Sequence, residues 1–164
     1  MIYLLDANTL IEAKNRHYGM DFCPAYWDFI ELEANNTTLA SIDMIYDELK
    51  EYGDDLSQWV KDRKDLIYNI SSENPDIQKK FAEIADFVSN HPVYSQSEKD
   101  RFLSGADPWL IAVASVMECI IVTHEVIVPP NSKKIKIPNI AQNFEVIWIS
   151  PFEMIRKLGG KFVL

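Results

Sequence analysis

The sequence predicts an α/β protein built on a central, mostly parallel sheet. Two short apolar runs, residues 2–5 and 120–122, have the length and composition of strands that are buried on both faces. A third run at 144–150 precedes a last helix, and segments with helical spacing lie between the runs. Strands that alternate with helices in this way favour a parallel sheet covered by helices on both faces.

The helices are predicted from the spacing of apolar residues and from residues that start or stop helices. Ser41 is expected to be the N-cap of one helix, which Gly53 closes. A polar connector without a strong preference is expected at 91–106, and a proline-rich loop or hairpin at 127–139. The expected helices are 8–15, 25–34, 42–52, 54–66, the strongly amphipathic 76–91, a buried helix that begins at 107, and 151–159.

Length and composition favour one domain, residues 1–164, with a sizeable core. The net charge of −9 argues against a protein that binds nucleic acid by neutralising many phosphates, but it allows an acidic site that holds a divalent cation. Cys23 and Cys119 lack metal-ligand spacing, so they are expected to be reduced core thiols. With no signal segment and no apolar run long enough for a bilayer, a cytoplasmic protein without a membrane partner is expected.

Four acidic residues stand where this fold brings strand ends and helix starts together. Asp6 and Glu125 each follow a buried strand, and parallel neighbours deliver their carboxyl ends to the same edge. Asp107 precedes Pro108 and an apolar helix, so it is equally explained as a helix cap. Glu48 lies beside the apolar face of its helix, where a carboxylate is often simply solvated.

Several carboxylates in one cleft repel one another unless a cation is present. Oxygen ligands of this kind suit Mg²⁺ or Mn²⁺, and such ions can stabilise both the attacking and the leaving oxygen of a phosphodiester. The three histidines form no recognisable catalytic pattern, although His124 is adjacent to Glu125. The acidic residues therefore favour metal-dependent hydrolysis.

The segments "YLLDAN", "IYDEL", "ADPWLIAVA" and "CIIVTHE" occur in this order along the chain. Together they resemble the PIN domain, named from the PilT N-terminus, and the opening of the chain resembles an uncharacterised bacterial subgroup of that superfamily. The resemblance implies a three-layer α/β/α sandwich. Many PIN domains are metal-dependent ribonucleases, including VapC-type toxins of type II toxin–antitoxin pairs. It therefore also implies an RNA substrate, a small antitoxin partner and a possible homodimer.

The resemblance assigns roles to individual residues. It implies that the catalytic and metal-binding acids are Asp6, Glu48 and Asp107, with Glu125 where the family carries an aspartate. Thr123 matches the threonine of that last motif, and Asn8 is in a place where a small polar residue helps to orient water. The longer side chain of Glu125 is a real departure from the pattern.

A few basic residues are candidates for positioning the RNA phosphates. Tryptophans at 27, 59 and 109 could stack on bases, but core packing is the stronger expectation for them. The candidate phosphate contacts are Lys14, Arg16, Lys133, Lys134 and Lys136.

Two other functions compete with the ribonuclease. The first is a PIN-like protein-binding module without catalysis, in which Glu125 marks a degraded site. The second is a phosphatase of the haloacid-dehalogenase type, which also places an aspartate after its first strand. That family has a second aspartate two residues later, where this chain has Asn8.

Overall fold

The computed structural model describes residues 1–164 and contains a sheet of four parallel strands. The strands β1 (Tyr3–Leu5), β2 (Leu39–Ala40), β3 (Ile120–Val122) and β4 (Trp148–Ile149) lie in the order β2-β1-β3-β4. All three pairings are parallel, so the carboxyl ends of the strands lie at one edge of the sheet. The predicted α/β class and the parallel sheet are confirmed.

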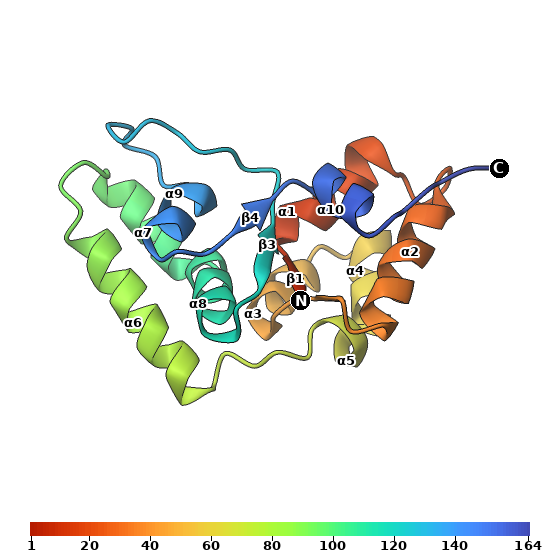
Figure 1. Ribbon diagram of the computed structural model, residues 1–164, viewed down its shortest axis with the longest axis horizontal. Coiled ribbons are helices and arrows are strands. Elements are labelled where there is room, and N and C mark those ends of the chain that lie inside the picture. Colours follow the sequence, from red (N-terminus) through yellow and green to blue (C-terminus); the bar gives the residue numbers. More distant parts are fainter.

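Helices cover the sheet on both sides (Figure 1). Figure 1 shows α6, α7, α8 and α9 on one side of the strands and α2, α4 and α5 on the other. The helices are α1 (Ala7–Glu12), the π-helix η1 (Ala13–His17), α2 (Pro24–Asn35), α3 (Asp43–Leu49), α4 (Asp55–Asp62), α5 (Lys64–Ile67), α6 (Pro75–Ser89), α7 (Gln96–Ser104), α8 (Asp107–Met117), α9 (Ile137–Asn143) and α10 (Pro151–Lys157).

A single cluster of 38 buried hydrophobic residues forms the core. Helix α8 is the central helix of this core, because it packs on β3, α6, α7 and α9. Helix α6 buries Ile77, Ile84 and Val88 on one face, as its amphipathic pattern predicts. The ring of Trp109 on α8 stacks on Phe81 of α6 with centroids 3.9 Å apart.

The other two tryptophans in question also pack within the protein. Trp27 is buried, and its ring lies edge-on to Trp59 at 5.1 Å. Trp59 additionally carries the guanidinium of Arg63 over its ring. The expectation of core packing is therefore confirmed for all three tryptophans.

Ser41 is not the N-cap of α3, so that prediction is wrong. Ile42 is at the N-cap position and Ser41 donates its hydroxyl hydrogen bond to the carbonyl oxygen of Leu5, 2.8 Å away. Ser41 follows β2, which lies beside β1, and its side chain is fully buried there. Tertiary pairing of the two strands thus replaces the local capping bond.

Two helices occur where the sequence predicts none. Helix α7 lies within the expected polar connector, and α9 begins inside the expected proline-rich loop. Helix α7 buries only Phe102, so it lacks the apolar repeat by which amphipathic helices are recognised. Its start is set by Ser95, whose hydroxyl accepts a hydrogen bond from the N–H of Glu98.

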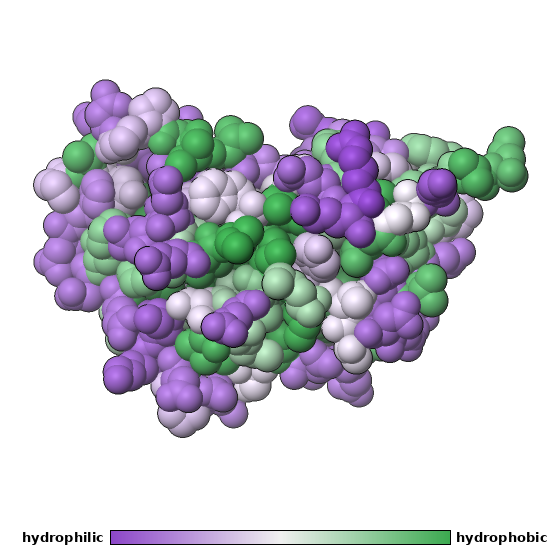
Figure 2. Space-filling view, in the orientation of Figure 1, coloured by the Kyte–Doolittle hydropathy of each residue, from purple (hydrophilic) through white to green (hydrophobic).

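The surface is mostly hydrophilic around the periphery of the face shown in Figure 2, with hydrophobic side chains gathered towards the middle. None of the helices combines the length and the hydropathy that a membrane crossing requires.

Candidate active site

Asp6 is held at the carboxyl end of β1 by hydrogen bonds from two threonines. Its Oδ1 accepts from the N–H and hydroxyl of Thr9 at 2.8 and 2.6 Å, and its Oδ2 accepts from the hydroxyl of Thr123 at 2.6 Å. The carboxylate thereby caps α1. Burial raises the pKa of Asp6 to about 6, although the bonds from Thr123 and Thr9 act in the opposite direction.

Asp6, Glu48, Asp107 and Glu125 line one cleft of about 250 Å³, which we call the acidic cleft. They come from four parts of the chain: the end of β1, helix α3, the first residue of α8 and the segment after β3. The structure therefore brings together all four acids that the sequence singles out. Asn8, also predicted at this site, lines the same cleft.

Asp107 is not a helix cap. Ala106 is at the N-cap position of α8, and the Asp107 carboxylate forms no hydrogen bond within the chain. The pKa of Asp107 is raised to about 7, mainly by burial and in addition by the negative charges of Glu125, Asp6 and Glu48. Asp107 is therefore a half-buried carboxylate whose environment favours a neutralising cation or proton.

Glu48 and Glu125 are held by backbone N–H groups. Glu48 Oε1 accepts from the N–H of Ala106 at 3.0 Å, and Glu125 Oε2 accepts from the N–H of Ile137 at 2.6 Å. Thr123 also links the end of β3 to the segment that follows, because its Oγ1 accepts from the N–H of Glu125. In this arrangement no three Asp, Glu, His or Cys side chains are grouped closely enough to hold a metal ion.

The donor set nevertheless has the chemistry of a site for a hard divalent cation. Four carboxylates line the cleft, and their repulsion raises the pKa of Asp107. The two glutamates have long side chains, and each is held by one backbone N–H bond. To share one cation, the carboxylates would have to lie closer together than they do here.

Arg101 on α7 is a cleft residue that sequence reasoning missed. It is the only basic side chain that lines the acidic cleft. Its Nε donates to Glu98 Oε2 at 2.6 Å and its Nη2 donates to the carbonyl oxygen of Ile135 at 3.0 Å. The positive charge of Arg101 lowers the pKa of Asp107, so it partly offsets the acidic neighbours. The sequence carried no signal for it, because its segment was expected to be a connector.

The five predicted phosphate contacts lie outside the acidic cleft. Lys14 pairs with Asp54 and Arg16 with Glu12. The three late lysines, 133, 134 and 136, form no ion pair, and Lys134 lines a separate pocket. His124 does not line the cleft either; its ring packs near His17 and Phe152.

A solved structure has the same architecture. It is the crystal structure of VapBC2 from Rickettsia felis bound to a DNA fragment from the VapBC2 promoter. This chain matches it with a TM-score of 0.52 and 18% sequence identity. The match covers 92% of this chain and 98% of that chain. The protein is thus an α/β protein with a PIN-like fold, and the predicted resemblance is confirmed for the fold.

Residues 3–162 match the family model described as a domain of unknown function (DUF4411), and the chain belongs to that family. No curated protein matches the sequence.

Proposed function

We propose that the protein is a metal-dependent endoribonuclease and the toxin of a type II toxin–antitoxin pair. One observation carries the proposal: Asp6, Glu48, Asp107 and Glu125, far apart in sequence, line one cleft at the carboxyl end of a parallel sheet. The PIN-like fold, shared with a VapBC structure, supports the same conclusion.

The residues of the cleft have separable tasks in this proposal. Asp6, Glu48, Asp107 and Glu125 are the residues that would hold Mg²⁺ or Mn²⁺, and the bound ion would supply positive charge for the activation of water and for the charge on the phosphodiester. Thr9 and Thr123 fix the orientation of Asp6. Asp107, which has no hydrogen bond within the chain, is free to bind the cation or to orient the water.

Arg101 is the cleft residue suited to hold the RNA phosphate. A guanidinium has five N–H donors, of which Nε and Nη2 donate to Glu98 and Ile135. These two bonds fix the side chain, and the remaining donors can bind phosphate oxygens in a forked geometry. Arg101 thereby adds a phosphate contact inside the cleft to those that the sequence suggested outside it.

Cleavage of RNA by the purified protein tests the proposal. We expect cleavage in Mg²⁺ or Mn²⁺ and loss of cleavage with a chelator. Asp6→Asn should lose at least about a hundredfold in rate, because an uncharged amide binds a divalent cation much more weakly than a carboxylate does. The control is Asp47→Asn, next to Glu48 on α3, where the exposed carboxylate pairs with Lys50 outside the cleft. Undiminished cleavage by Asp6→Asn would contradict the assignment of this site.

A small antitoxin that covers the acidic cleft is the partner implied by a toxin. The matched solved structure is of a VapBC assembly, which supports such a partner. A gene for a small protein beside the gene for this chain is the simplest supporting observation. If the protein cleaves no RNA with either metal, the PIN-like fold serves instead as a protein-binding module.

A further inference from the structure

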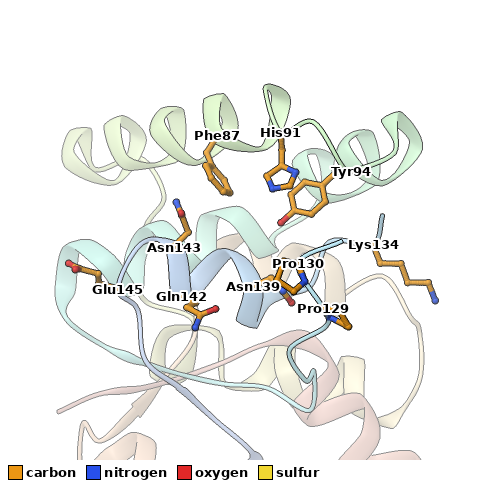
Figure 3. A pocket seen from close by; sticks show the side chains of 10 residues that line it. All are labelled: Phe87, His91, Tyr94, Pro129, Pro130, Lys134, Asn139, Gln142, Asn143 and Glu145. Carbon is orange, nitrogen blue, oxygen red and sulfur yellow. The ribbon is translucent and has the colours of Figure 1, made fainter. Parts of the chain in front are cut away.

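A second pocket lies apart from the acidic cleft. It has a volume of about 480 Å³ and shares no lining residue with the cleft. Figure 3 shows it between the end of α6, the turn that follows, the proline-rich loop and α9. We call it the α6–α9 pocket.

One wall of the α6–α9 pocket is aromatic. The rings of His91 and Tyr94 stack with centroids 3.7 Å apart and planes 12° apart, and Phe87 lies edge-on to His91 at 5.5 Å. Burial and the charge of Lys99 lower the pKa of His91, which favours the neutral form of its ring. A planar ring that enters the pocket can therefore meet a stack that is already formed, at little cost in side-chain entropy.

Four polar side chains of the pocket are not used within the chain. The side chains of Lys134, Gln142, Asn143 and Glu145 line it and form no hydrogen bond or ion pair. Side-chain amides offer a donor and an acceptor together, which matches the edge of a nucleobase. Asn139 differs, because its amide binds both the N–H and the carbonyl oxygen of Val128 and so fixes the wall of the pocket.

One loop connects the pocket with the acidic cleft. The loop after β3 begins at the cleft with Glu125, whose carboxylate accepts from the N–H of Ile137 at the start of α9. Its middle part contributes Pro129, Pro130 and Lys134 to the pocket. Arg101, a cleft residue, donates to Ile135 in the same loop. The two sites are therefore joined by contacts of a single loop.

We propose that the α6–α9 pocket binds an unpaired nucleotide of the RNA, with its base on the His91–Tyr94 stack and its phosphate at Lys134. Single-stranded RNA is recognised by stacking of bases on aromatic side chains and by hydrogen bonds to base edges. The exposed Lys134 supplies the charge for a phosphate. The proposal rests on the proposed ribonuclease function for its substrate class, and it gives that function a contact outside the cleft.

Titration of the full chain with the four nucleoside 5′-monophosphates, followed by ¹H–¹⁵N NMR, tests the pocket directly. We expect at least one nucleotide to shift the side-chain amide signals of Gln142 and Asn143. Tyr94→Leu should weaken this binding at least about tenfold, because stacking on an aromatic ring is lost, whereas Tyr94→Phe should retain it. Lys134→Gln, a change at an exposed side chain that does not threaten folding, should also weaken binding.

The control is Lys61→Gln, an exposed lysine on α4, which lies on the opposite side of the strands from α6 and α9 (Figure 1). It should bind nucleotide like the wild type. Absence of shifts with all four nucleotides, or equal binding by wild type, Tyr94→Leu and Lys134→Gln, would overturn the proposal.

Cleavage assays separate this proposal from the proposed function. If both hold, Lys134→Gln raises the KM for RNA with little change in kcat, and Asp6→Asn abolishes cleavage while it retains nucleotide binding. Cleavage by the wild type without nucleotide binding would refute the α6–α9 pocket alone. Nucleotide binding without cleavage would refute the ribonuclease alone.

Discussion

Asp107 has an environment that disfavours its negative charge. Burial is the main cause, and the three other carboxylates of the acidic cleft add repulsion. Asp6 is more deeply buried, but it accepts three hydrogen bonds, which favour its charged form. The pKa of both aspartates is raised, but only the charged form of Asp6 is stabilised by hydrogen bonds within the chain.

The raised pKa values predict that the metal-free protein loses stability as the pH rises. Asp6 and Asp107 have folded-state pKa values of about 6 and about 7, against an ordinary value of 3.8. Between about pH 4 and 7 the folded state therefore binds more protons than the unfolded state. As the pH rises through this range, the two aspartates lose these protons and the free energy of unfolding falls. Asp107→Asn should raise this free energy at pH 8 by roughly 1–3 kcal/mol and flatten its pH dependence, as urea unfolding measures.

A matched control for this measurement is Asp76→Asn. Asp76 is also in the first turn of a helix next to a proline, but it is exposed and outside the cleft. Its substitution should leave stability unchanged or slightly lower, because an aspartate near a helix N-terminus is favourable. Equal effects of the two substitutions would show that the cleft does not penalise the charge of Asp107.

At the level of elements, side chains connect the carboxyl ends of β1 and β3. Thr123 donates to Asp6 Oδ2, and the single hydroxyl proton of Thr9 is shared between Asp6 Oδ1 at 2.6 Å and the carbonyl oxygen of Val122 at 3.0 Å. Both threonines are buried. The position of Asp6 therefore depends on the pairing of the two strands as well as on α1.

Thr123→Val should remove the hydroxyl with little change in volume. It leaves Asp6 Oδ2 without a donor, so we expect a loss of roughly 1–3 kcal/mol in unfolding free energy and a further rise in the pKa of Asp6. Cleavage should fall, and Thr123→Ser should restore it. Thr38→Val is the control: its hydroxyl binds Glu33 away from the cleft, so its loss should affect stability but not cleavage. Cleavage by Thr123→Val equal to that of the Thr38 variant would refute the positioning role.

The elements also show how far sequence reasoning reaches. Strands β1, β3 and β4, helices α6 and α8, and the convergence of the four acids were predictable, because apolar periodicity and chain order report burial and strand ends. Helix α7 was missed because it exposes a polar surface, and with it Arg101. Lys14 was predicted as a phosphate contact, but its pairing with Asp54 depends on how α4 packs, which local sequence does not report.

At the scale of the whole molecule, acidic charge is in excess and part of it is concentrated in one place. The chain carries 25 acidic and 16 basic residues, and four of the acids line the acidic cleft with Arg101 as their only basic neighbour. Five further basic residues are engaged in ion pairs outside the cleft, and Arg101 itself is paired with Glu98. An anionic substrate can therefore approach the cleft favourably only when its negative charge is offset.

A divalent cation should stabilise the whole fold if it binds in the acidic cleft. Binding to the folded state alone adds about 1.4 kcal/mol at ten times the Kd, which raises the Tm of a chain of this size by roughly 3–6 °C. We expect this rise with MgCl₂ or MnCl₂ in thermal unfolding, and a much smaller one with NaCl at the same ionic strength. Asp107→Asn should lose most of the rise, whereas Asp47→Asn should keep it. A rise of equal size in both variants would place the cation elsewhere on this acidic surface, because Asp47 lies outside the cleft.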